Sequence, residues 1–306
     1  MKVTLFGYIS RDRNILPSGE TSEIVGGKGL FGATALSRSG IEVELVTWLP
    51  ENDLGLLSEL NNLGITIHVI PMDVGVATTN THTDDVTIAT STSDPKPITI
   101  ADITEDIRQA IVTSDVVLFM PEAEHKVPID VIRYISHDLG LTVFADIGKY
   151  FRKTETDETL TPQYPWPRQA EFLSSFTTVF LSAEDVQAAI DQGESILSLA
   201  RTMAEEGPAE VVITEGSKGA WVFSRETNEL IHVEVYPPKN IVDPTGAGDT
   251  FIGAYVAEHL RSDDIHASGR FASMAASLSL NYSGPLRESA TEINAKLKEI
   301  GETAKD

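Results

Sequence analysis

The chain has 306 residues, 41% of them hydrophobic, and a formal net charge of -23. A surface this acidic repels nucleic-acid phosphates, so we expect no nucleic-acid partner. Because there is no cysteine, disulfides and thiolate chemistry are excluded, and the first residues, MKVTLFGYIS, do not resemble a signal peptide. No apolar run approaches the length of a membrane span, so we expect a cytoplasmic protein with no membrane partner.

Two segments of the N-terminal part are expected to form small β elements. Residues 9–25 are polar and contain Pro17 and Gly19, and residues 76–93 are rich in Thr with an Asp-Asp turn between two short runs. Thr favours a pleated, half-buried surface. We predict that both segments form one small β lid that closes over a bound molecule and excludes water, although 76–93 also fits an ordinary edge hairpin.

Buried strands alternate with amphipathic segments in the middle of the chain. Four runs are near-continuous in Val, Phe, Leu and Ile, namely 115–120, 141–146, 177–181 and 210–214. Strands that are buried on both faces show this pattern. Helical spacing follows in 128–140, where Gly140 is placed to end a helix, and in 183–192. The alternation predicts an α/β fold with a mostly parallel sheet.

The sequence VDPTGAGDTF at 242–251 predicts a loop that enters a helix, because strand-like alternation precedes it and helical spacing follows it. Gly246, Ala247 and Gly248 then lie where free amides and the helix dipole attract a phosphate. Asp249 follows in the first turn, where it can accept a proton from an attacking hydroxyl. The dipole should keep Asp249 ionised and weakly basic. A plain helix N-cap is the alternative role.

The longer string VDPTGAGDTFIGAYVA (242–257) closely resembles the C-terminal signature of the ribokinase-like (PfkB-type) carbohydrate kinases, D-T-x-G-A-G-D-x-F, with Pro244 in the place of a usual Thr. Three further segments resemble that family. GYISRDRN (7–14) is similar to its first strand and substrate-binding Asp, GGKGLFGATALSRSG (26–40) to its di-glycine signature, and VVITEGSKGAWVF (211–223) to its nucleotide-side strands.

The resemblance implies a single ribokinase-like domain, a three-layer α/β/α sandwich with a small β lid. It implies ATP as the donor, with Mg²⁺. Asp249 would be the catalytic base, and the segment Gly246 to Gly248 would form the anion hole for the transferring phosphoryl group. Four residues would lie on the nucleotide side, namely Thr214, Gly216, Gly219 and Asn281.

The family's cation positions are only partly preserved. Asp243 and Thr245 match positions that often help to bind a monovalent cation such as K⁺, but Pro244 separates them. The family's Asn-x-x-Glu, which organises Mg²⁺ through water, maps onto SAED. Ser182 then stands for the Asn, and Asp185 for the Glu, or Glu184 if the register slips by one residue.

On the acceptor side, Gly26 and Gly27 would let the backbone approach hydroxyl groups, and Asp12 would accept hydrogen bonds from two of them. The other acceptor-site candidates are Lys28, Phe31, Glu124 with Glu122 as its rival, and Arg152. Phe31 either faces a ring-shaped acceptor or packs in the core, and Arg152 either meets the acceptor or γ-phosphate or forms a surface ion pair. We expect a nucleoside, cyclic polyol (inositol) or sugar, with the first two ahead of a free pentose.

Other functions remain open. GKGLFG (27–32) matches a dinucleotide-binding fingerprint, but about 20 residues separate it from the first strand. A non-catalytic ligand sensor would not need the base. A sugar-phosphate kinase would need basic side chains, and Arg11, Arg13, Lys28 and Arg152 are the candidates. The histidines lack metal-site spacing and there is no P-loop. Because lids of this family also serve as dimer surfaces, a homodimer is a further expectation.

Overall fold

A computed structural model provides the fold. The structure describes residues 1–15, 19–82, 87–91, 93, 95–122, 126–154, 160–162, 166 and 168–303. Among these residues, no helix is both long enough and apolar enough to cross a membrane.

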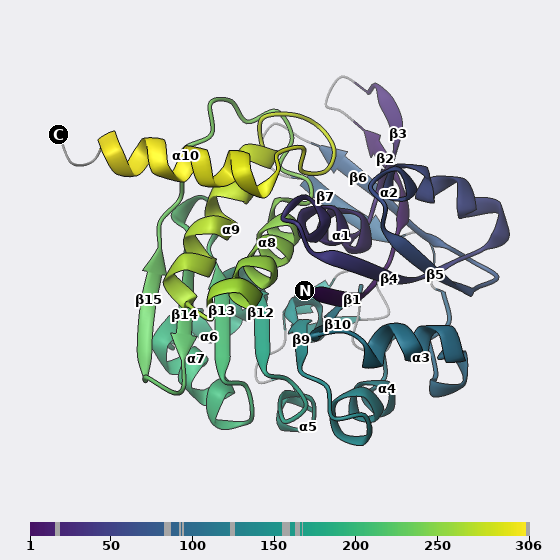
Figure 1. Ribbon diagram of the computed structural model, residues 1–306, viewed down its shortest axis with the longest axis horizontal. Coiled ribbons are helices and arrows are strands. Elements are labelled where there is room, and N and C mark those ends of the chain that lie inside the picture. Colours follow the sequence, from purple (N-terminus) through teal and green to yellow (C-terminus); the bar gives the residue numbers. More distant parts are fainter. Residues whose placement is uncertain are drawn as a thin grey trace.

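A nine-stranded sheet forms the centre of the molecule (Figure 1). Its strands are, in spatial order, β15 (Glu229–Val233), β14 (Ala220–Ser224), β13 (Glu210–Thr214), β12 (Thr178–Ser182), β9 (Val143–Asp146), β8 (Val116–Met120), β1 (Lys2–Gly7), β4 (Glu42–Leu49) and β5 (Thr66–Pro71). The strands from β13 to β5 are parallel to one another. Strand β14 pairs in antiparallel fashion with both of its neighbours, β13 and β15. The mostly parallel sheet predicted from the four apolar runs is confirmed.

Helices cover both faces of this sheet and complete the predicted three layers. One face carries α1 (Lys28–Arg38), α2 (Ser58–Asn62), α8 (Ala247–Ser262), α9 (Ile265–Ser279) and α10 (Ala290–Thr303). The other carries α3 (Glu105–Val112), α4 (Ile129–Arg133), α5 (Gln169–Leu173), α6 (Gln187–Asp191) and α7 (Ile196–Glu205). Because each face has its own buried cluster, strands such as β8 are buried along their whole length, which is why they read as continuous apolar runs.

The predicted helices are present but locally irregular. The segment 128–140 contains α4 followed by a π-helical turn at Tyr134–Asp138, and Gly140 then takes a φ of 68°, as a residue beyond a helix end does. The segment 183–192 begins as a short 3-10 helix, Ala183–Val186, before α6. The hydrophobic periodicity predicted both helices, but it did not predict the π-helical turn in one or the 3-10 turn in the other.

A second, four-stranded sheet lies beside the central one. Its order is β3 (Thr21–Gly26), β2 (Ser10–Ile15), β6 (Val76–His82) and β7 (Thr87–Ser91), so the two Thr-rich and polar segments belong to one β element. The register pairs Asp12 with Thr78 across β2 and β6. Figure 1 shows this sheet standing off one side of the molecule. The turn at 83–86 lies outside the described residues, and the role of this sheet as a lid stays a prediction.

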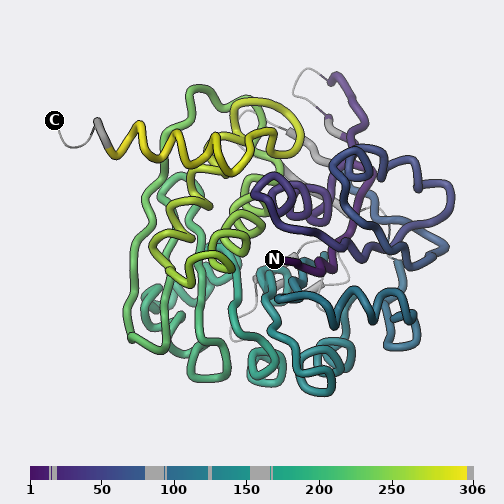
Figure 2. Tube along the Cα trace, in the orientation of Figure 1, coloured from purple at the N-terminus to yellow at the C-terminus, as the bar shows by residue number. Residues whose placement is uncertain are grey.

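The small sheet connects directly to the core through α1. Gly26 ends β3, and α1 begins two residues later at Lys28. In Figure 2 the purple and blue N-terminal part occupies one side of the molecule, and the green and yellow C-terminal part, with α8 to α10, occupies the other. Helices α1 and α8 pack against each other where the two parts meet. A site between the N-termini of α1 and α8 therefore draws residues from both ends of the chain.

Candidate active site

The carboxyl ends of the parallel strands carry most of the polar residues of the candidate site. Tyr8 follows β1, Glu122 follows β8, Asp146 is the last residue of β9 and Thr214 is the last of β13. Open α/β sheets bind ligands at this edge, because the loops that leave the strands surround a common crevice. The loop before α8 closes the site on the other side.

That loop turns sharply at Gly246, the N-cap residue of α8, which has a φ of 74°. A Cβ at this position would lie 2.2 Å from the ring of Phe31, so the turn requires glycine for both conformation and space. No side chain caps α8. Asp249 lies at the third helical residue, so the alternative that it is the N-cap is wrong.

Two of the first amides of α8 differ from their neighbours in hydrogen bonding. The amide of Ala247 donates to the carbonyl oxygen of Pro244 at 3.2 Å and that of Thr250 to Gly246 at 2.8 Å. In the described part of the chain, the amides of Gly248 and Asp249 have no backbone acceptor. A Cβ at Gly248 would meet no atom within 4 Å, so open space lies in front of this turn. Of the predicted anion hole, the Ala247 amide is therefore occupied and the Gly248 amide is free, and its role in phosphate binding stays a prediction.

Asp249 is more basic than the sequence suggested. Burial raises its pKa to about 6, an effect that Lys28 opposes and Asp146 reinforces. The expectation that this carboxylate is weakly basic is therefore wrong, because desolvation raises its pKa more than Lys28 and Lys149 lower it. A pKa near 6 suits a general base that works close to neutral pH.

Lys28 forms a buried ion pair with Asp146, joining the start of α1 to the end of β9. Burial alone would lower the pKa of Lys28, but the negative charges of Asp146 and Asp249 overcome this and raise it. Asp146 also accepts a hydrogen bond from the amide of Gly148 at 3.0 Å. Lys28 is therefore a fixed positive charge near Asp249, and it is held by Asp146, a carboxylate that the sequence analysis did not single out.

The acceptor side contains carboxylate oxygens with no partner. Asp12 is 6% exposed, and its Oδ1 atom has no hydrogen-bond partner. A Cβ at Gly26 would lie 2.1 Å from Asp12 Oδ2, which explains why glycine stands there. Glu122 accepts a hydrogen bond from Trp48 Nε1 at 3.3 Å through one oxygen, while its Oε2 atom is buried and unpaired. Burial raises the pKa of both acids.

Tyr8 shows that these groups form one cluster. Burial raises the pKa of its phenol, and four carboxylates raise it further, those of Asp249, Glu122, Asp12 and Asp146. The interaction brings together residues from β2, β9, α8 and the loops that follow β1 and β8. The site therefore combines the predicted Asp12 and Asp249 with three residues that sequence reasoning missed or ranked lower.

The remaining acceptor-side predictions have different outcomes. Phe31 is 3% exposed and packs against the Gly246 turn, so it belongs to the core. Gly27 has a φ of 99°, and a Cβ there would lie 2.5 Å from the Tyr8 carbonyl oxygen. Arg152 opens β10 (Arg152–Thr154), which pairs with β11 (Leu160–Pro162), but its side chain lies outside the described part. Glu124 is also outside it, and its rival Glu122 occupies the site.

An apolar pocket of about 400 Å³ lies on the other side of the α8 N-terminus. Its lining includes five predicted residues, namely Thr214, Gly216, Gly219, Ala247 and Gly248. Asn281 does not line it. The Asn281 amide donates to the carbonyl oxygens of Ser277 and Leu278 at 3.2 and 3.0 Å and so closes the end of α9.

The residues predicted to bind metal make hydrogen bonds within the protein, and their role in metal binding stays a prediction. Asp185 Oδ2 accepts hydrogen bonds from the amide and hydroxyl of Ser182 at 2.9 and 2.7 Å, so this carboxylate caps a short helix. Asp243 Oδ1 accepts from the amide of Thr245 at 2.9 Å and shapes the loop. Within the described ranges, no three His, Cys, Asp or Glu side chains form a metal site. A Mg²⁺ ion that arrives with a nucleotide would be held mainly by phosphate oxygens and water.

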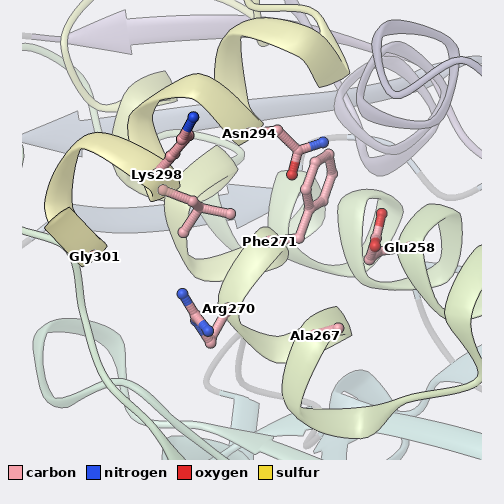
Figure 3. Close-up of a pocket in the computed structure, with 8 residues that line it drawn as sticks. Glu258, Ala267, Arg270, Phe271, Asn294, Lys298 and Gly301 are labelled. Atoms are coloured by element: carbon pink, nitrogen blue, oxygen red, sulfur yellow. The ribbon is translucent and has the colours of Figure 1, made fainter.

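A larger cavity, of about 650 Å³, lies between α8, α9 and α10 (Figure 3). Its charged lining, Glu258, Arg270 and Lys298, has both signs. Glu258 is nine residues after Asp249 on α8, which separates them by about 13 Å. The larger cavity is therefore not the candidate site, because no predicted catalytic or binding residue lines it.

The GKGLFG motif does not form a dinucleotide fingerprint. It follows β3 of the small sheet, whereas that fingerprint must follow a strand of the central sheet. Gly29 and Gly32 lie inside α1, where Gly29 donates its amide to the Tyr8 carbonyl oxygen at 2.8 Å. These glycines allow close packing of α1 and do not cradle a pyrophosphate.

Comparison with known proteins identifies the family of the chain. The family described as pfkB family carbohydrate kinase matches residues 2–292. The ribokinase of Bacillus subtilis (strain 168) is 28% identical over 266 residues, which cover 84% of this chain and 81% of that protein. A nucleoside kinase of Methanothermobacter thermautotrophicus is 37% identical over 82 residues, and that match spans only 27% of this chain and 25% of the relative.

Among solved structures, a pyrophosphate-dependent kinase in the ribokinase family, complexed with a pyrophosphate analog and myo-inositol, superposes with a TM-score of 0.80. The match covers 95% of this chain and 99% of that chain at 19% sequence identity. At this identity the likeness supports the fold alone.

Proposed function

Because the chain belongs to the pfkB family of carbohydrate kinases, and is therefore a kinase, we propose that it transfers the terminal phosphoryl group of ATP to a hydroxyl of a neutral, polyhydroxylated acceptor. The observation that carries this proposal is the pair of unpaired, buried oxygens, Asp12 Oδ1 and Glu122 Oε2, in the same cluster as Asp249. A buried acceptor atom without a donor is unfavourable, and the hydroxyl groups of a sugar-like ring would supply the missing donors. Relatives named ribokinase and nucleoside kinase fit this class.

The charge of the site favours a neutral acceptor over a sugar phosphate. Two of the basic residues available for an existing phosphate are already paired: Lys28 with Asp146, and Arg11 with Asp53 at 2.6 Å on the outer side of the small sheet. Arg13 is exposed. A phosphate brought within about 4 Å of one carboxylate would be repelled by about 4 kcal/mol at the effective dielectric constant of such sites. Four carboxylates surround Tyr8 here.

The chemistry follows from the positions of Asp249 and the α8 N-terminus. Asp249 accepts the proton of the attacking hydroxyl, and Lys28 beside it stabilises the carboxylate before transfer. The amides of Gly248 and Asp249 face the developing negative charge of the transferring group. Mg²⁺ supplies charge neutralisation on the donor phosphates when it is bound.

Within the neutral acceptors, we place cyclic polyols and nucleosides first. Phe31, the aromatic side chain that could have favoured a nucleobase, lies in the core, so it does not argue for the nucleoside over the polyol. The shared chemistry is a ring with neighbouring hydroxyl groups, which two carboxylates bind well.

A coupled ADP-release assay over nucleosides, inositols, pentoses, hexoses and sugar phosphates tests the proposal. We expect turnover with at least one neutral polyol or nucleoside, and none with sugar phosphates. Turnover confined to sugar phosphates would refute the neutral acceptor. As a matched test, Glu122→Gln should raise the KM for the neutral acceptor much more than it changes kcat, because it removes a charged hydrogen-bond acceptor from substrate binding.

A further inference from the structure

Trp48 is a core residue that also contacts the acceptor side of the candidate site. It lies near the carboxyl end of β4 and is 1% exposed. Its ring belongs to the apolar cluster that contains Phe6 and Ile70. Strand β4 lies between β1 and β5, and Trp48 is in register with Ile70 on β5. The sheet and the cluster therefore hold the indole in one position.

The indole N–H of Trp48 is bonded to Glu122. Trp48 Nε1 donates to Glu122 Oε1 at 3.3 Å. Glu122 lies in a loop, two residues after the end of β8, whereas Trp48 lies in a strand. Strands β8 and β4 are on opposite sides of β1, the strand that leads to Tyr8. The bond therefore joins a loop carboxylate to a part of the sheet that is not its direct neighbour.

The two oxygens of Glu122 differ in their contacts. Oε1 accepts the bond from Trp48, and Oε2 is buried with no hydrogen-bond partner in the described part of the chain. A buried indole N–H needs an acceptor, but a backbone carbonyl would meet this need without the burial of a carboxylate. Burial raises the pKa of Glu122, and the bond from Trp48 and the charge of Lys126 oppose this rise. This arrangement is unfavourable for folding alone and suits a carboxylate that binds a ligand.

We infer that Trp48 is a positioning residue of the acceptor site: its indole N–H holds one oxygen of Glu122 and leaves the other available to a hydroxyl group of the acceptor. A free Glu side chain has several rotamers, and ordering it upon binding costs affinity. Trp48 removes this cost because it orders the carboxylate before the acceptor arrives. The inference rests on the proposed function, since it requires that Glu122 binds the acceptor.

Steady-state kinetics of Trp48→Phe test this inference, with a compound from the ADP-release panel that turns over. Phe keeps an aromatic ring in the core and removes the N–H group. We expect the KM for the acceptor to rise about tenfold, the effect of one lost hydrogen bond, and kcat to change by less than about twofold. Replacement of Trp48 by benzothienylalanine, which has the shape of Trp but no N–H group, should raise KM equally without a cavity. An unchanged KM in these two variants would overturn the inference.

A double-mutant cycle with Glu122→Ala separates positioning from packing. In that background, Trp48→Phe should not raise KM further, because the carboxylate on which Trp48 acts is gone. The same rise in both backgrounds would overturn the inference and leave the proposed function intact. Trp221→Phe is the matched control, because Trp221 Nε1 donates to Glu215 Oε2 at 2.6 Å on the nucleotide side. It loses the same kind of bond and should leave the KM for the acceptor unchanged.

The substrate panel distinguishes failure of the inference from failure of the proposed function. Turnover of sugar phosphates alone would refute the neutral acceptor, and the same variants, measured with a sugar phosphate, would still decide the role of Trp48. Turnover of no compound in the panel would overturn both proposals.

Discussion

Replacement of Asp249 by Asn tests whether Asp249 acts as a catalytic base or has a structural role only. Asn has the shape of the protonated acid but cannot take a proton from the acceptor. Because Gly246 is the N-cap of α8 and the amides of Gly248 and Asp249 remain in place, the donor phosphates should bind as before. We expect phosphoryl transfer to fall by about 10²–10⁴, the range for a lost general base.

The same substitution should stabilise the protein. A pKa of about 6 in the folded state, against 3.8 for the free side chain, means that the folded protein binds this proton more tightly than the unfolded chain. Ionisation therefore destabilises the fold above pH ~4, and the full effect, about 3 kcal/mol, is present above pH ~6. Asn has no charge to bury, so Asp249→Asn should raise the thermal midpoint at pH 8 by about 5 °C. At pH ~5 roughly half of this gain should remain.

The assay combines single-turnover transfer, with an acceptor found in the ADP-release screen, and thermal unfolding at pH 5 and pH 8. Asp263→Asn is the matched control, because Asp263 is exposed at the other end of α8. It should change neither transfer nor stability by more than about 0.5 kcal/mol. Near-wild-type transfer by Asp249→Asn would show that the base lies elsewhere. An unchanged thermal midpoint at pH 8 would show that Asp249 is not desolvated in the free enzyme.

Three further predictions follow from the same geometry. In the wild type, kcat/KM should rise tenfold per pH unit up to about pH 6 and then level off, because the base must be deprotonated; a flat profile from pH 5 to 8 would contradict a titrating Asp249. Gly246→Ala should lower the thermal midpoint and should slow phosphoryl transfer by more than tenfold, because its Cβ would lie 2.2 Å from Phe31. A variant with a normal thermal midpoint and a normal transfer rate would contradict the requirement for a left-handed turn at this position. Lys28→Met should destabilise the protein by about 3–5 kcal/mol in urea unfolding, and adding Asp146→Asn should restore much of this, because a buried charge loses its partner in the single variant only.

Local features of the site could be predicted from the sequence, whereas contacts between distant segments could not. The glycine turn before α8 and the position of Asp249 in the first helical turn depend on about ten consecutive residues. The pattern of these residues is therefore enough to predict both features. Phe31 could not be assigned, because its partner, the Gly246 turn, lies more than 200 residues away. The pairing of Lys28 with Asp146 could not be predicted for the same reason, although the apolar run at 141–146 predicted a buried strand that ends at Asp146. Glu122 could be placed in the site only from its burial in the structure.

The charge of the site explains why the helix N-terminus matters so much in this protein. The chain carries a formal charge of -23, yet its donor is a polyanion. In the part of the chain that the structure describes, Lys28, which Asp146 already holds, and Lys149 are the positive side chains that act on Asp249. Backbone amides attract phosphate through fixed dipoles and, unlike an added Arg, introduce no charge that would neutralise the base. If Mg²⁺ balances the remaining phosphate charge, as we propose, transfer should depend more steeply on the metal than on any single basic side chain.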